Sequence, residues 1–206
     1  MNYLAHVYLA SNDPESVVGN LMGDFLKGDI DPSLPLELRR GIRMHRQVDV
    51  FTDQHPVFLQ SKRRLKPEFR RYAGILVDVF YDHILARYWD DYAIEPLHCF
   101  TERVYDNVEC FHHLLPERMQ RTMRFVVDRD LLTSYRELGA IALTLKGISG
   151  RLSRANPVAN GIEELMRLQT ELAEDFERFL PDLVQFVDQM ERNDTRADLL
   201  HRHRVL

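Results

Sequence analysis

The stretch His45-Arg46-Gln47-Val48-Asp49-Val50-Phe51-Thr52-Asp53 mixes ionisable side chains with apolar ones. His45 and Asp49 are four residues apart, so on a helix they lie one turn apart on the same face. Asp53 continues that face if the helix persists. A charge among apolar neighbours is costly unless it is paired or binds a metal. The stretch therefore predicts a helix that carries part of a buried metal or acid–base site.

A second stretch, Asp78-Val79-Phe80-Tyr81-Asp82-His83, repeats the four-residue spacing inside a longer apolar run. We interpret the two stretches as helices that face one shared site. The alternative is that Asp49 and Asp82 form ordinary ion pairs with arginines such as Arg46 and Arg87. Either helix taken alone is compatible with both interpretations.

Apolar residues recur at three- and four-residue steps along most of the chain, and no alternation is long enough to build a β-sheet. This periodicity predicts helices that include 2–10, 15–27, 36–51, 68–92 and 162–192. A chain of 206 residues with 45% hydrophobic content suffices for one globular domain. We therefore expect an all-α, single-domain helical bundle over 1–206, with 193–206 as a frayed tail.

The composition disfavours several classes of protein. The longest apolar runs fall well short of the roughly 20 residues that a membrane helix needs, so we expect no membrane partner. Cys99 and Cys110 are the only cysteines and form no CxxC pair, which favours a reducing cytoplasm over a disulfide-stabilised secreted protein. Dinucleotide, Walker-type and GxSxG motifs are all missing from the sequence.

Positive charge is concentrated between Arg39 and Arg71, where ten Lys and Arg face three Asp and Glu in a chain of net charge −5. Such a block favours an acidic partner and raises the rate of association. Nucleic acid is disfavoured, because the whole chain is acidic and the block has no interleaved aromatic platform. A solvated helix face is the alternative. The candidate partner-binding residues are Arg39, Arg40, Arg43, Lys62, Arg63 and Arg64.

Four polar pairs share the four-residue spacing within the first 83 residues: Asn2/His6, Asn20/Asp24, His45/Asp49 and Asp78/Asp82, with His83 next to the last. Histidine and aspartate ligands without cysteine suit Mn²⁺, with Mg²⁺ or Fe²⁺ as alternatives, better than a structural zinc. Such an ion lowers the pKa of bound water from 15.7 towards ~7 and neutralises phosphate charge. The pattern therefore favours metal-assisted hydrolysis of a phosphoester.

The chain resembles the bacterial acyl carrier protein phosphodiesterases. The resemblance is carried by the stretches 1–6, 19–25, 44–49 with 52–53, and 78–83, and it weakens after about residue 92. It implies a divergent branch of the HD phosphohydrolases, which are all-helical and metal-dependent. It also implies a reaction in which water and holo-acyl carrier protein give the apo-protein and 4′-phosphopantetheine. The acidic carrier would dock on the basic block.

The resemblance leaves the exact ligand list open, because the adjacent His-Asp pair of the HD superfamily is not obvious here. The nearest doublets are Gly23-Asp24 and the reversed Asp82-His83. The candidate catalytic residues are Asp24, His45 and Asp78. The candidate metal ligands are His6, Asp24, His45, Asp78, Asp82 and His83. Residues expected to support these ligands or contact phosphate are Asn2, Asn20, Arg46 and Asp49.

Simpler roles remain open for some of these residues. Asp24 can pair with Lys27, and Arg46 can pair with Asp49 or Asp53 instead of phosphate. Two other functions compete with the carrier-protein phosphodiesterase. One is an HD-type hydrolase of a small nucleotide such as a guanosine polyphosphate, and the other is a non-catalytic helical binding module.

Overall fold

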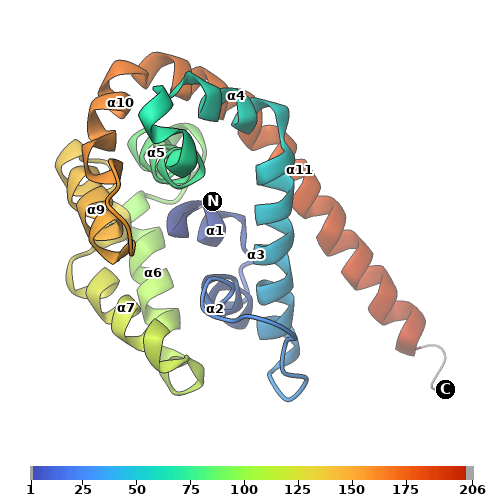
Figure 1. Ribbon diagram of the computed structural model, residues 1–206. Coiled ribbons are helices and arrows are strands. Elements are labelled where there is room, and N and C mark those ends of the chain that lie inside the picture. Colours follow the sequence, from blue (N-terminus) through green and yellow to red (C-terminus); the bar gives the residue numbers. More distant parts are fainter. Residues whose placement is uncertain (1, 203–206) are drawn as a thin grey trace.

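The computed structural model describes residues 2–202, and side-chain burial over residues 2–194. Within these residues the chain is helical and forms no β-strand, which confirms the all-α prediction (Figure 1). The α-helices are α1 (Tyr3–Leu9), α2 (Pro14–Met22), α3 (Leu36–Gln54), α4 (Pro56–Arg64), α5 (Ala73–Arg87), α6 (Leu97–Cys110), α7 (Glu117–Asp128), α8 (Leu131–Ser134), α9 (Leu138–Arg151), α10 (Gly161–Arg167) and α11 (Gln169–Arg202). Short 3₁₀ helices are η1 (Pro67–Tyr72), η2 (Trp89–Asp91), η3 (His112–Leu114) and η4 (Val158–Asn160). The relation to the HD fold stays a prediction, and most of the expected tail, 193–206, lies outside the residues with described side chains.

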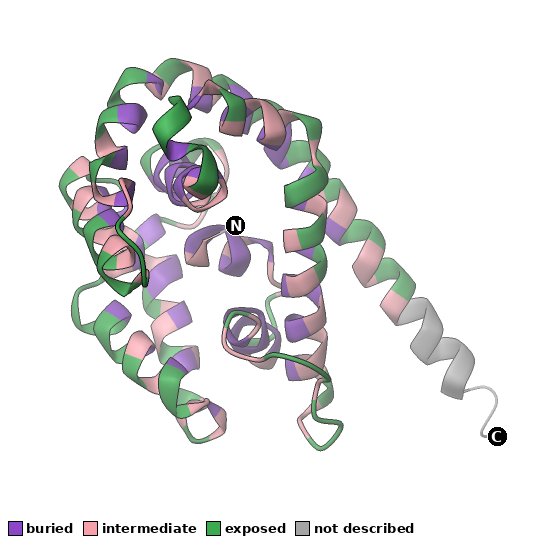
Figure 2. Ribbon diagram, viewed as in Figure 1, coloured by how far each residue is buried: buried purple, intermediate pink, exposed green. Residues whose placement is uncertain are grey.

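Helices α1 and α5 occupy the middle of the bundle (Figure 1). The apolar run of α5 buries Leu76, Val77, Phe80 and Leu85 almost completely, and α1, α4, α9 and α11 all pack against this helix. Burial of each such side chain contributes about 1.5–3 kcal/mol. Buried residues face inward from the surrounding helices (Figure 2). The core therefore surrounds the helix that carries Asp78, Asp82 and His83.

Helix α2 packs very closely along α3. An added Cβ at Gly19 would stand 2.1 Å from the carbonyl oxygen of Leu38, and one at Gly41 would stand 2.3 Å from that of Ser16. Larger side chains at these two positions would push the helices apart. The close approach brings the end of α2 next to the middle of α3, where His45 lies.

Three helices differ from the periodicity prediction. The helix expected over 15–27 ends at Met22, so Asp24 lies in the following turn. The helix expected over 68–92 is α5 flanked by the short η1 and η2. The segment 162–192, which the sequence predicts as a helix or a helix broken at Pro181, is divided at Leu168 instead, and α11 continues through Pro181 to Arg202. None of the described helices is long and apolar enough to cross a bilayer.

A buried carboxylate joins α4 to α11. Asp175 is fully buried and accepts hydrogen bonds from Arg64 Nε at 2.8 Å and Arg64 Nη2 at 3.2 Å. Its two oxygens also accept from Ser61 Oγ at 2.7 Å and Gln60 Nε2 at 3.1 Å. Four donated hydrogen bonds offset the cost of removing this charge from water. Arg64 is therefore part of the attachment between two helices.

Candidate metal centre

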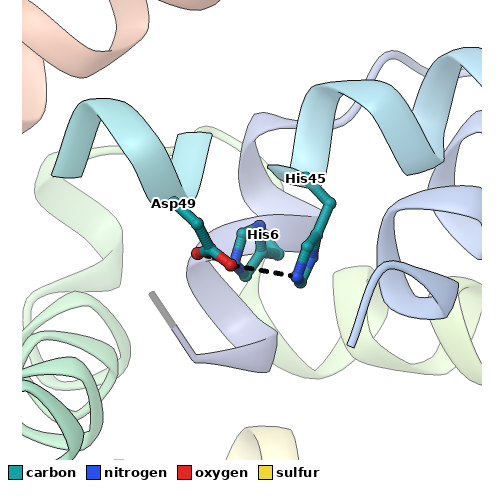
Figure 3. A group of neighbouring side chains, drawn as sticks. All are labelled: His6, His45 and Asp49. Carbon is teal, nitrogen blue, oxygen red and sulfur yellow. Dashed lines mark hydrogen bonds and ion pairs between the residues drawn. The ribbon is translucent and has the colours of Figure 1, made fainter. Parts of the chain in front are cut away.

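Three side chains from two helices converge on one another (Figure 3). His6 comes from α1, and His45 and Asp49 come from one face of α3. His6 Nε2 lies 3.2 Å from Asp49 Oδ1, and His45 Nε2 lies 3.3 Å from Asp49 Oδ2. One ligand atom from each residue lies within 4.8 Å of the others. The group can hold a divalent metal ion.

The two imidazole rings are stacked, with centroids 3.9 Å apart and planes inclined by 19°. Their side chains are only 1% and 3% exposed, whereas Asp49 is 42% exposed. The Nδ1 atoms of both rings are buried without a hydrogen-bond partner among the described residues. The polar contacts of both rings are therefore directed through Nε2 towards the carboxylates.

Burial and the carboxylates act in opposite directions on the two imidazoles of this cluster. Burial lowers the pKa of His6 to about 4, although its hydrogen bond with Asp49 acts in the opposite direction. Burial also disfavours the charged form of His45, but hydrogen bonds with Asp24 and Asp49 outweigh it and raise its pKa to about 9. A metal ligand must be a neutral imidazole. A cation bound here would therefore take the place of the His45 proton.

Asp24 extends the cluster towards the surface. It lies in the turn after α2, and its Oδ1 is 3.4 Å from His45 Nε2. The side chain is 43% exposed, so it is open to a ligand as well as to His45. The structure thus places Asp24 and His6 in contact with His45, and adds Asp49 as a direct contact of both imidazoles.

Gly23 decides where the His45 ring can lie. A Cβ built at Gly23 would stand 2.2 Å from Cγ of that ring and 2.3 Å from its Cδ2. The backbone of Gly23 is ordinary right-handed helix, with φ −52° and ψ −38°, so close approach is the reason for glycine here. Any larger side chain must displace the imidazole from its carboxylates.

We expect Gly23→Ala to lower metal affinity and to reduce activity by about tenfold or more, because overpacking of this kind costs about 1–3 kcal/mol. Metal content after dialysis against a fixed free-ion concentration measures the first effect. Gly139→Ala is the matched control, since an added Cβ on that α9 glycine meets no atom within 4 Å. Native metal affinity in Gly23→Ala would contradict the role given to this contact.

Asp78 approaches the cluster from α5 without belonging to the three-residue group. Its side chain is half-buried. Burial raises the pKa of Asp78, and the negative charges of Asp49 and Asp53 act in the same direction. Asp78 therefore lies within electrostatic reach of the site.

Asp82 and His83 are occupied elsewhere in the fold. The Asp82 carboxylate accepts hydrogen bonds from the backbone N–H groups of Leu4, at 2.8 Å, and Ala5, at 3.0 Å. It thereby caps the start of α1, although burial raises its pKa to about 7. His83 Nδ1 donates to the carbonyl oxygen of Tyr135 at 2.7 Å. These contacts position α1 and the α8–α9 connection, and neither residue joins the three-residue group.

The expected supporting residues have varied surroundings. Asn2 is the N-cap of α1 and donates from Nδ2 to the Tyr135 hydroxyl at 3.1 Å. Asn20 is fully buried, and neither of its amide atoms has a hydrogen-bond partner among the described residues. Arg46 donates to the carbonyl oxygens of Gly28, at 2.8 Å, and Leu26, at 3.0 Å. Arg46 thus fixes the loop after α2.

Much of the basic block is engaged within the protein. Arg40 pairs with Glu37, Arg43 lies 3.9 Å from Asp194, Lys62 lies 3.8 Å from Asp53, and Arg64 binds Asp175. Arg39 has a buried Nε without a hydrogen-bond partner among the described residues. Arg63 is exposed. Of the six predicted docking residues, Arg63 is the one placed fully at the surface.

Comparison with known proteins identifies close relatives over nearly the full length. The family described as acyl carrier protein phosphodiesterase matches residues 1–183. A protein of that name from Photorhabdus laumondii is 32% identical over 186 residues, which cover 90% of this chain and 94% of the relative. The namesakes from Pectobacterium atrosepticum and Serratia proteamaculans are 33% and 35% identical, and the alignments cover 90% of this chain and 96% of each relative. No solved structure matches the chain.

Proposed function

The chain belongs to the acyl carrier protein phosphodiesterase family, and we propose that it hydrolyses the phosphodiester that attaches the prosthetic group to holo-acyl carrier protein. Water adds hydroxide to phosphorus, the bond from phosphorus to the carrier's serine oxygen breaks, and that oxygen takes up a proton. The products are 4′-phosphopantetheine and the apo-carrier. The observation that supports this most directly is the His6, His45 and Asp49 cluster at the centre of a member of this family.

The donor set of the cluster fits a divalent metal. Two imidazole nitrogens and a carboxylate converge, a second carboxylate lies beside them on Asp24, and no cysteine takes part. We propose Mn²⁺ as the metal, with Mg²⁺ or Fe²⁺ as alternatives. The bound ion would supply a Lewis acid and a source of hydroxide at neutral pH. His6, His45, Asp49 and Asp24 would hold it.

Asp78 remains our candidate for moving a proton during the reaction. Burial raises the pKa of Asp78, and a carboxylate whose pKa is raised is the kind of group that serves as a general acid or base. Asp82 would act at a distance, by holding α1 so that His6 faces His45, and His83 would fix the backbone at Tyr135. Residues that do not bind the metal themselves can orient its ligands through contacts of this kind.

The acidic carrier would approach a positively charged surface. We propose that Arg63 contributes most to this attraction. Arg39, Arg40, Arg43 and Lys62 would add to it, although Arg40, Arg43 and Lys62 lie near acidic residues of the protein itself. Such charges act mainly on the association rate and are screened by salt. Cys99 and Cys110 are free thiols, and the cytoplasm is the compartment we propose for the reaction.

The test is to incubate the metal-loaded protein with holo-carrier and measure the intact mass of the carrier. We expect loss of the prosthetic group, abolition by exhaustive chelation, and recovery with Mn²⁺ or Mg²⁺ but much less with Ca²⁺, which prefers larger and more flexible oxygen sites. A guanosine polyphosphate in parallel tests the nucleotide alternative. An unchanged carrier mass with the metal-loaded protein would refute the proposed substrate.

A further inference from the structure

A cavity of about 810 Å³ opens beside the metal centre, between α7, α8, α9 and the start of α1. Asp24, which lies 3.4 Å from His45 Nε2, is also one of the residues that line the cavity, so this carboxylate is shared by the cavity and the cluster. Its volume lies within the range of roughly 300–1,000 Å³ that small-molecule and cofactor sites occupy. Nothing in the metal chemistry itself accounts for a space of this size.

The lining of the cavity has a charged part and an apolar part. Asn2, Asp24 and Arg151 are among its polar and charged residues. The rest is mainly apolar and includes Phe125 and Leu143, which are 49% and 71% exposed. Exposed apolar groups gathered in one place mark a surface that a ligand covers. Thr122 and Ser134 also line the cavity, and their hydroxyl groups donate to the backbone carbonyl oxygens of Arg118 and Leu131. A ligand with an anionic head and a long neutral tail fits both parts.

Two guanidinium groups lie near the charged part. Burial raises the pKa of Tyr3 to about 12, the charge of Asp24 adds to this rise, and Arg151 and Arg118 oppose it. Tyr3 is therefore within electrostatic reach of Asp24 and of both arginines. Arg118 lies over the Phe25 ring at 6.0 Å, and neither arginine forms an ion pair among the described residues. A guanidinium fork at such a place suits the oxygens of a phosphodiester.

We propose that this cavity is the binding site for the pantetheine arm of the substrate, with the phosphate at the Asp24 end beside Arg151. This inference rests on the proposed function, and it adds the place at which the prosthetic group binds. The scissile phosphate is the point where the arm begins, so the arm must leave the metal centre through a space that opens next to it. The hydroxyl oxygens of Thr122 and Ser134 keep the capacity to accept hydrogen bonds from the amide N–H groups of the arm.

Helix α9 offers a matched pair of positions to test the site. Gly147 lines the cavity, and Gly150 lies three residues later on the same helix but is not a lining residue. A Cβ added at either glycine meets no atom within 4 Å. A phenylalanine at Gly147 would thus begin in open space and take up cavity volume, whereas the same change at Gly150 starts outside the cavity lining.

We expect Gly147→Phe to raise KM for holo-carrier by about tenfold or more with kcat nearly unchanged, because it removes contacts made in both ground and transition states. Calorimetry with free 4′-phosphopantetheine should show a loss of affinity of similar size. Gly150→Phe should match the native protein in both measurements. Each variant should bind as much metal as the native protein.

Native KM and native affinity for 4′-phosphopantetheine in Gly147→Phe would overturn the inference, as would equal losses in Gly150→Phe. Loss of metal from Gly147→Phe alone would also overturn it, since the substitution would then act on the metal centre. The calorimetric measurement separates this inference from the proposed function. A native protein that binds 4′-phosphopantetheine in the cavity but leaves the carrier intact would refute only the hydrolysis.

Discussion

Replacing His45 by alanine is expected to lower kcat for release of the prosthetic group by about 10³-fold or more, because a metal centre supplies several kcal/mol of transition-state stabilisation. His45 contacts each of the other three residues of the centre. Its Nε2 contacts both Asp49 and Asp24, and its ring stacks on that of His6. Without it, Asp24 and Asp49 keep their mutual repulsion and lose a shared partner. Single-turnover measurement of the carrier's intact mass gives the rate, and metal analysis gives the occupancy.

The control for this prediction is His55→Ala. His55 caps α4 by accepting from the Val57 N–H, and it pairs with Asp182 at 3.2 Å, away from the metal centre. Its loss should cost about 0.5–2 kcal/mol of stability and leave activity within about threefold of native. A His45→Ala protein that keeps a stoichiometric metal ion and native turnover would show that the cluster is not the catalytic centre.

Replacing Arg64 by glutamate is expected to lower the free energy of unfolding by about 3–5 kcal/mol, the range seen when one partner of a buried ion pair is removed. The fully buried Asp175 would lose two hydrogen bonds and face a second negative charge. Urea unfolding followed by far-UV circular dichroism measures the change. The slope of the free energy with denaturant should stay constant if only stability has changed.

Arg63→Glu makes the same charge change at the neighbouring residue and serves as the control. Arg63 is exposed, so its substitution should alter stability by only about 0.5 kcal/mol. The same two variants also test docking. A change in KM and in its salt dependence for Arg63→Glu would indicate that Arg63 contributes to binding of the carrier. A change in KM for Arg64→Glu would arise mainly from the loss of stability. Equal stabilities of the two variants would contradict the structural role assigned to Arg64.

The sequence by itself determined the helical class and the proximity of His45 and Asp49. Apolar residues at three- and four-residue steps specify helices, because that spacing places them on one face whatever the helix later packs against. For the same reason, the spacing of His45 and Asp49 was enough to bring the two side chains together on α3. From the sequence, Asp49 is predicted only to support the metal ligands. Spacing along one helix does not show which carboxylate oxygens face a residue of a second helix.

The same local pattern had a different outcome on α5. Asp82 has the spacing and the apolar neighbours of a ligand, but both its oxygens accept from the start of α1. Conversely, Asp24 does not share a helix face with Asn20 as its spacing predicts, because α2 ends at Met22. The turn that follows places Asp24 beside His45. Tertiary packing decides which hydrogen-bond donor lies against each carboxylate. The spacing of residues in the sequence carries no information about that donor.

Tertiary structure alone decided how the separate helices meet and what space they leave. Close packing of α2 on α3 depends on Gly19, Gly41 and Gly23, which allow backbone and ring atoms to approach within distances that a Cβ would prevent. The cavity arises between α7, α8, α9 and the first residues of the chain, more than a hundred positions apart in sequence. Helical periodicity acts over a few residues, whereas a shared site and its cavity form only when distant segments fill, or fail to fill, the same volume.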